Sequence, residues 1–124
     1  MHLSVAPFRP PPFSDAFTRA SEMAGDVPGA YADAPCRFLE LPAGALGPPG
    51  RYVLAVCQRA AEAGHQSHLR ERSFTAAQRF LLSLACDGID AVWSAELPDE
   101  RALRAAGVPL DGAVPVGVIR CDTD

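Results

Sequence analysis

Proline is distributed unevenly along this chain of 124 residues, and its distribution limits where helices and strands can form. Nine of the 12 prolines lie in residues 1–50, and they include the run Pro10–Pro12. Because proline lacks a backbone N–H and clashes with the preceding helical turn, it is disfavoured in helix interiors and central strands. We therefore expect residues 1–50 to form an arm and connecting segment, and residues 51–124 to form the regular core.

Two short elements are still expected within the first 50 residues. Ser14 has the position of an N-cap for a helix that ends near Gly25. Residues 36–41 alternate weakly between apolar and polar and predict a short strand. Three prolines and three glycines in residues 42–50 indicate a long loop. The arm before them either embraces a neighbouring subunit or is a loose terminus.

The hydrophobic pattern becomes regular after residue 50. Residues 51–57 form a continuous apolar run, which is typical of a buried strand. Residues 58–72 are polar and predict a loop with some helix. Ser73 then has the position of an N-cap for a helix apolar over most of its girth, and Gly88 is placed to end it. Its core residues are expected to be Phe74, Phe80 and Leu84.

A second round of elements follows this helix. Residues 89–95 alternate and predict a short strand, whereas residues 113–121 read as a last buried strand. Between them, Pro98 is expected at the first position of a short helix closed by Gly107. The order strand, helix, strand, helix, strand predicts a layered α+β or α/β domain.

Charge and cysteine content argue against several classes of protein. The chain has 15 acidic and 11 basic residues, a net charge of −4 and no basic cluster, so a nucleic-acid partner is disfavoured. No apolar run approaches the ~20 residues that cross a bilayer, and the N-terminus lacks the features of a secretory signal. The four cysteines form no CxxC pair. We therefore expect a cytoplasmic protein with reduced thiols and no membrane partner.

Three segments of the second half carry distinctive patterns. Residues 76–90 begin with Ala-Ala-Gln, contain a Leu-Leu pair and end in a Gly-Ile turn. Residues 97–109 form a short helix with a Gly-Val-Pro exit, and residues 114–119 begin with Val-Pro. In this order and at these separations they resemble the flavin-dependent nitroreductase family, over roughly residues 52–121. The resemblance implies an α+β fold with a nitroreductase-like layered sheet and a central buried helix, in truncated form.

The resemblance also implies a function. Members of the family are dimers that bind FMN; NAD(P)H reduces the flavin, which passes electrons to nitro, quinone, enone or azoline acceptors. The cofactor carries this chemistry, so no catalytic side chain is expected. By resemblance, the backbone around Ser94, Ala95 and Glu96 contacts the flavin ring. Glu96 brings a negative charge to a position where the family commonly has glycine.

The chain departs from the family where the flavin phosphate is held. It has neither the Arg-Arg-Ser-type motif nor the Ser-x-x-Asn motif, it contains no Lys and no Asn, and it ends in the acidic residues 121–124. The flavin site is therefore expected to be incomplete. Two functions remain open. One is a reduced nitroreductase-like FMN oxidoreductase, or one chain of such an enzyme that obtains its missing phosphate ligands from another chain, in a homodimer or a heterodimer with a related chain. The other is a non-catalytic structural or regulatory partner with the same fold.

Two further side-chain patterns have a functional and a structural interpretation. His65, His68 and Glu71 are spaced for one face of a helix and could hold a metal, but HxxH is common by chance, and solvated histidines are favoured. Trp93 could stack on a flavin, but a lone aromatic in a strand is more often a core or subunit contact. We therefore assign neither a metal site nor a catalytic residue.

Overall fold

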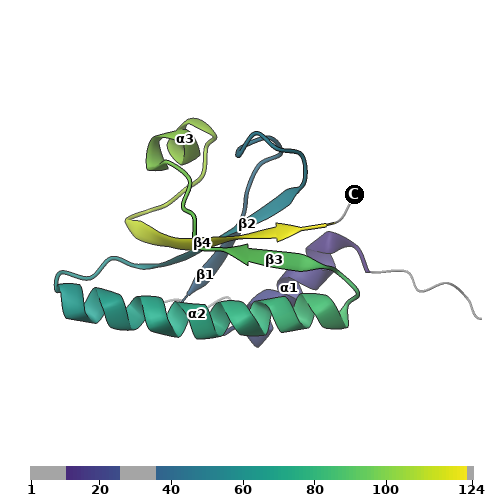
Figure 1. Cartoon of the computed structure of the whole chain (residues 1–124), viewed down its shortest axis with the longest axis horizontal. Helices are drawn as coiled ribbons and strands as arrows, with labels where there is room; N and C mark the ends of the chain where they lie inside the picture. The colour runs from purple at the N-terminus through teal and green to yellow at the C-terminus, as the bar shows by residue number, and fades with distance from the viewer. Residues whose placement is uncertain (1–10, 26–35, 123–124) are drawn as a thin grey trace, which may run out of the picture.

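The computed structural model describes residues 11–25 and 36–122, which form an α+β fold around one antiparallel sheet (Figure 1). The strands lie side by side in the order β1-β2-β4-β3. The elements, in chain order, are α1 (Phe13–Met23), β1 (Arg37–Glu40), β2 (Arg51–Gln58), α2 (Ala63–Cys86), β3 (Ala91–Ser94), α3 (Glu100–Ala105) and β4 (Ala113–Cys121). The predicted strands in residues 36–41, 51–57, 89–95 and 113–121 are thus confirmed.

One face of the sheet is covered by α2, with α1 packed beside it. The centre of this layer is Phe80, which is fully buried. Its ring stacks on Phe38 of β1 with the centroids 4.3 Å apart, and Phe17 of α1 meets it edge-on at 5.7 Å. Although α1 and β1 belong to the proline-rich half of the sequence, both contribute buried side chains to the same core as α2.

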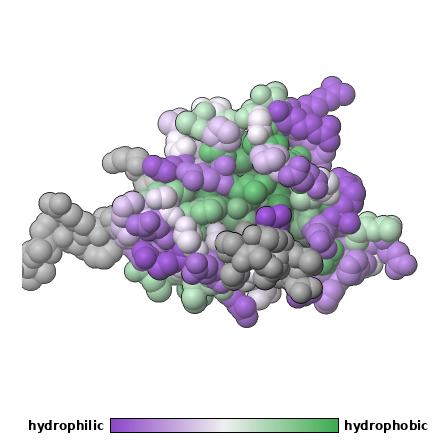
Figure 2. Space-filling view, turned by 180° about the vertical axis from the view of Figure 1, so that it is seen from behind, coloured by the Kyte–Doolittle hydropathy of each residue, from purple (hydrophilic) through white to green (hydrophobic). Residues whose placement is uncertain are grey.

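The other face of the sheet is covered in its middle by α3, which lies across the sheet from α2 in Figure 1. Leu103 of α3 is fully buried and packs with Leu54 of β2 and Val118 of β4. Because neighbouring residues of a strand point to opposite faces, β2 contributes Leu54 to this side and Val53 to the side of α2. Seen from behind, hydrophobic residues gather across the middle of the molecule, between hydrophilic margins (Figure 2).

Gly117, which follows a bulge in β4, leaves room for Trp93. Ala55 pairs with Gly117 but Val56 pairs with Pro115, so Val116 is an extra residue in β4. A Cβ at Gly117 would overlap the Trp93 ring and lie 2.9 Å from the Ser94 carbonyl oxygen. The missing side chain at this position therefore allows β3 and its tryptophan to pack closely on β4.

Helix α2 is much longer than the pattern predicts. It has 24 residues, and its first turns are formed by residues 63–72, which were expected to be mainly loop. The prediction of Ser73 as an N-cap was wrong, because Ser73 is buried inside the helix and its Oγ donates to the Leu69 carbonyl at 2.7 Å. Within the described part of the chain, no helix is both long and apolar enough to cross a membrane.

The two other predicted helix starts are each displaced. Helix α1 begins at Phe13 after Pro12, and no side chain caps it, so the prediction of Ser14 as its cap was wrong. Helix α3 is capped by Asp99, whose Oδ1 accepts from the Arg101 N–H at 2.9 Å. The Asp99 carboxylate can accept a hydrogen bond from a backbone N–H of the first turn, whereas a proline side chain cannot. Pro98 therefore precedes the N-cap and is not the first helical residue.

Helix ends are predicted more accurately than helix starts. Gly88 follows α2 with a φ of 76° and Gly107 follows α3 with a φ of 81°. Both glycines adopt the left-handed conformation that ends a helix at low cost, as predicted. The segment 42–50 contains no helix or strand, which confirms the expected loop.

Gln66 holds the start of α2 to the end of β2. Its Oε1 accepts from the Ala60 N–H at 2.7 Å, while its Nε2 donates to the Gln58 carbonyl at 2.8 Å and to Cys57 Sγ at 3.3 Å. We expect Gln66→Leu to lower the free energy of unfolding by about 1–3 kcal/mol, because these groups lose their partner. Urea denaturation measures the change. Gln78→Leu, at an exposed position of the same helix, is the matched control, and equal losses would contradict the proposed role.

Candidate functional site

Ser94, Ala95 and Glu96 lie where β3 ends and the chain turns toward α3, and all three are exposed. Ser94 and Glu96 line a pocket of about 470 Å³, which we call the strand-end pocket. It opens on the face of the sheet that carries α3. Its full lining is Leu46, Pro48, Tyr52, Val92, Ser94, Glu96, Leu97, Pro98, Val118 and Arg120.

The strand-end pocket has an apolar floor and a charged rim. Tyr52 of β2 and Val92 of β3 both pair with Arg120 of β4. Val118 lies two residues before Arg120, so the three apolar side chains share one face of the sheet. A surface of this kind suits one side of a flat ring system. The rim carries one negative side chain, Glu96, and one positive side chain, Arg120.

Two polar groups of the strand-end pocket, the Glu96 N–H and the Arg120 guanidinium, already have partners within the chain. The Glu96 N–H donates to Ser94 Oγ at 3.2 Å, so the backbone amide assigned to the flavin by resemblance has an acceptor. Arg120 lies 3.6 Å from the Asp122 carboxylate, and both side chains are more than half exposed. Such exposed ion pairs contribute little to stability, so a ligand could replace the contact between Arg120 and Asp122 at low cost.

FMN fits this pocket only in part. Its isoalloxazine ring matches the apolar floor, but its phosphate needs several cationic or N–H donors. Among the residues that line the pocket, Arg120 is the only cation; it is shared with Asp122, and Glu96 adds a negative charge. The described residues of one chain therefore do not form a complete FMN site.

The fold resembles that of several solved proteins. A protein assigned as an NADH dehydrogenase/NAD(P)H nitroreductase from Bacteroides thetaiotaomicron has a TM-score of 0.61 at 18% identity, over 89% of this chain and 75% of that one. Iodotyrosine deiodinase bound to FMN and 3-iodo-L-tyrosine has a TM-score of 0.61 at 15% identity, over 93% and 80% of the two chains. A protein assigned as an NADH oxidase from Clostridium acetobutylicum has a TM-score of 0.60 at 15% identity, over 86% and 74%.

These neighbours define the class of fold. No protein-family model matches the sequence, and no curated protein matches it either. The fold is nitroreductase-like, as predicted from the three sequence segments, and the solved neighbours are longer chains. At identities of 15–18% the similarity establishes the fold and does not identify a reaction.

Trp93 is half-buried between the sheet and α2 rather than in the strand-end pocket. Its ring meets Phe74 edge-on with the centroids 6.0 Å apart. The prediction that Phe74 is a core residue was wrong, because its side chain is 42% exposed. It lies one residue after Ser73, which is on the buried face, and a helix turns by about 100° per residue.

His65, His68 and Glu71 are exposed on the first turns of α2. Among the residues that the structure describes, no group of three or more His, Cys, Asp and Glu side chains is placed to hold a metal ion. The histidines are therefore exposed to solvent. They lie on α2, which covers the face of the sheet opposite to the strand-end pocket.

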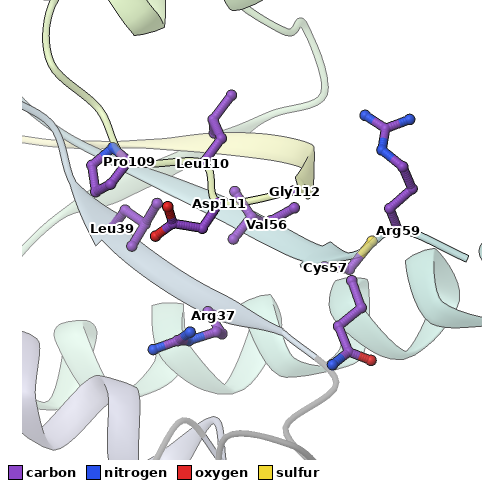
Figure 3. A pocket seen from close by; sticks show the side chains of 11 residues that line it. Arg37, Leu39, Val56, Cys57, Arg59, Pro109, Leu110, Asp111 and Gly112 are labelled. Atoms are coloured by element: carbon purple, nitrogen blue, oxygen red, sulfur yellow. The ribbon is translucent and has the colours of Figure 1, made fainter.

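A second pocket was not found from the sequence. It measures about 660 Å³ and is seen from close by in Figure 3. We call it the turn pocket, because one wall is the turn that precedes β4; the other walls come from β1 and the end of β2. Its lining is Arg37, Leu39, Val56, Cys57, Gln58, Arg59, Pro109, Leu110, Asp111, Gly112 and Ala113. No local motif marks it, since its residues come from three separate segments.

None of the four cysteines is in a disulfide; Cys36, Cys57 and Cys121 are buried, whereas Cys86 is exposed. Burial raises the pKa of Cys121 to about 11, and the neighbouring Asp122 carboxylate adds to this effect. Burial also raises the pKa of Cys57, against a smaller opposing effect of Arg70. The raised pKa values keep the thiols of Cys57 and Cys121 protonated at neutral pH, so both are poor nucleophiles.

Alkylation tests this difference between the thiols. At about pH 8, we expect iodoacetamide to modify Cys86 alone in the native protein, because attack requires an accessible thiolate. All four cysteines should react in urea. Mass spectrometry counts the adducts, and Cys86→Ser should leave the native chain unmodified. Native alkylation of Cys57 or Cys121 would contradict the burial described above.

Proposed function

We propose that this protein is a flavin oxidoreductase of nitroreductase-like fold, with FMN seated at the strand-end pocket and reduced by NAD(P)H. The observation that supports this proposal is the apolar pocket beside Ser94 and Glu96, in a fold shared with an FMN-bound protein. Bound flavin supplies the electron transfer to a nitro, quinone, enone or azoline acceptor. The residues of this chain would bind the ring and orient it.

The proposal includes a second chain, either another copy or a related protein. Among the described residues that line the pocket, Arg120 is the one cation that could meet the flavin phosphate, so we propose that the partner completes the site. Helix α2 also leaves apolar side chains in solvent: Phe74 is 42% exposed and Leu82 is 66% exposed. We propose that the dimer buries them, since burial of exposed apolar side chains favours association. Light scattering should give the mass of two chains.

Reconstitution with FMN tests the proposed function. Purified protein is mixed with FMN, passed through a desalting column and examined for retained flavin by absorbance and fluorescence. We expect retained flavin that is bleached by NADH or NADPH in the absence of oxygen. Protein that elutes as a dimer and retains no flavin would overturn the proposal for this chain acting with its own copy.

One observation favours the alternative, a non-catalytic partner. The Glu96 N–H is bonded to Ser94 Oγ and the Glu96 carboxylate lines the pocket, an arrangement that disfavours an anionic reduced flavin. A colourless dimer that takes up no FMN would support this alternative. The same protein should then associate with a related flavin-binding chain, which co-purification of the two chains would reveal.

Glu96 provides a direct test of charge at the strand-end pocket. We expect Glu96→Gln to tighten FMN binding by about threefold to tenfold, because a repulsion of about 1 kcal/mol between exposed charges is removed. Quenching of flavin fluorescence measures the dissociation constant. Glu22→Gln, an exposed carboxylate on α1, removes the same charge away from the pocket and should have no effect. An unchanged constant for Glu96→Gln would place the flavin elsewhere.

A further inference from the structure

The turn pocket is separate from the strand-end pocket. The two share no lining residue, although both open on the face of the sheet that carries α3. Between them lies the buried cluster of Leu54, Leu103 and Val108. Tyr52 lines one pocket and Val56 the other, which places them about 13 Å apart along β2 at the usual rise of a strand. An occupant of the turn pocket would therefore not touch a flavin at Ser94–Glu96.

The turn pocket has the size and wall of a small-molecule site. Its volume of about 660 Å³ lies within the range of about 300–1,000 Å³ typical of such sites. Leu39 and Leu110 are half-buried and Val56 is 2% exposed, so the apolar wall that a ligand can contact is formed mainly by the two leucines. This wall resembles the hydrophobic lining that usually surrounds the body of a bound ligand.

The turn that closes the pocket has a well-defined geometry. Asp111 has a φ of 49° and Gly112 a φ of 80°, and the Ala113 N–H donates to the Leu110 carbonyl at 2.8 Å. Two central residues with positive φ define a type I′ turn, for which Asp-Gly is a preferred sequence. The turn holds the Asp111 carboxylate beside Leu39 and Pro109 (Figure 3).

The charge of the turn pocket is opposite to that of the chain. The chain has a net charge of −4, whereas the pocket is lined by Arg37, Arg59 and only one carboxylate, Asp111. Arg59 is exposed and makes no hydrogen bond or ion pair with the described residues. It lies at the opposite end of the pocket from Asp111 in Figure 3. Its guanidinium offers planar N–H donors that match a carboxylate.

We propose that the turn pocket binds a small organic carboxylate, whose apolar body covers Leu39, Val56 and Leu110 and whose anionic group pairs with Arg59. A bare inorganic anion would leave the apolar wall in water, and a neutral hydrocarbon would leave the guanidinium without a partner. An aromatic or branched carboxylic acid can cover the apolar wall and also pair with the guanidinium. Its carboxylate group would then point away from Asp111. The site does not depend on the proposed flavin function.

Titration with 2-naphthoate, followed by ¹H–¹⁵N correlation spectra, tests the proposal. We expect shifts in residues 37–39, 56–59 and 110–113, with or without FMN. Arg59→Glu should weaken binding by about tenfold or more, since a charge-assisted contact becomes a repulsion. Arg101→Glu makes the same charge change at an exposed position of α3 outside both pockets, and it should leave the affinity unchanged. Both positions are on the surface, so neither variant should affect folding.

Two comparison ligands separate the contributions of the anion and the apolar body. The neutral analogue 2-naphthalenemethanol should bind at least about tenfold more weakly, and inorganic phosphate should cause no shifts at the pocket. Equal affinity for the neutral analogue, equal effects of the two arginine variants, or shifts centred on residues 92–98 would overturn the proposal. Loss of FMN binding without loss of naphthoate binding would count against the proposed function alone.

Discussion

Gly117→Ala is expected to lower the free energy of unfolding by about 3 kcal/mol or more, because the added Cβ would overlap the Trp93 ring. The backbone itself does not forbid alanine, since Gly117 is not among the residues with positive φ. The loss is therefore steric and arises from close packing of β3 on β4. Urea denaturation of the purified variant, compared with the parent chain, measures it.

Two further variants separate this steric effect from a general cost of alanine. Gly64→Ala adds a methyl group where nothing lies within 4 Å, and it should be neutral or stabilising by up to about 1 kcal/mol because it lies within α2. Adding Trp93→Ala to Gly117→Ala should recover part of the loss, since the overlapping ring is removed. The Ser94 carbonyl oxygen, 2.9 Å from the position that the new Cβ would take, would keep the recovery incomplete. No coupling between positions 93 and 117 would contradict the proposed contact.

Phe80→Ala is expected to lower the free energy of unfolding by about 3–5 kcal/mol. Phe80 is fully buried, and its ring joins α2 to β1 through Phe38 and to α1 through Phe17. Truncation would remove both aromatic contacts and leave a cavity between three elements. Because a domain of this size is stabilised by only about 5–15 kcal/mol, Phe80→Leu gives a second, milder measurement with an expected loss of about 1–2 kcal/mol.

Phe74→Ala is the natural comparison for Phe80→Ala on the same helix. Phe74 is 42% exposed and contacts Trp93 only along an edge, so truncation should cost about 1 kcal/mol in an isolated chain. In the proposed dimer the loss should be larger and should grow with protein concentration. Equal losses for the two phenylalanines at low protein concentration would show that α2 does not pack as described.

The strands and the helix ends could be predicted from the sequence because their signals are local. Apart from Arg51 and Arg120, the runs at residues 51–57 and 113–121 are almost entirely apolar, which marks strands buried on both faces. Gly88 and Gly107 end their helices because only glycine adopts the left-handed conformation without cost. The three segments between residues 76 and 119 were also sufficient to indicate the nitroreductase-like fold.

The start of α2 could not be predicted in this way. Residues 63–72 are polar because this part of the helix is largely exposed, and their pattern resembles a solvated loop. What holds the helix there is Gln66, through contacts to Gln58 and Ala60 that depend on the position of β2. Ser73 was misread as a cap because a serine hydroxyl also bonds the carbonyl four residues earlier inside a helix.

The candidate site also combines residues that the sequence indicated with residues that it did not. The sequence led to Ser94, Ala95 and Glu96 through resemblance, and their contact with a flavin remains a prediction. The apolar floor beneath them could not be predicted, because Tyr52, Val92 and Val118 are far apart in the sequence and meet only through strand order. The turn pocket has no local signal either, since Leu39, Arg59 and Asp111 belong to three separate segments.

The sequence by itself determined the strands, the helix ends, the α+β class and the absence of Lys and Asn. These depend on residue type and short-range periodicity, and a chain without Lys and Asn cannot supply those side chains in any fold. Only the tertiary structure decided where α2 begins, which side of it remains exposed, and where the two pockets open. The pockets depend on the order β1-β2-β4-β3, which brings distant residues to the same face of the sheet, and the start of α2 depends on the contacts of Gln66 with Gln58 and Ala60.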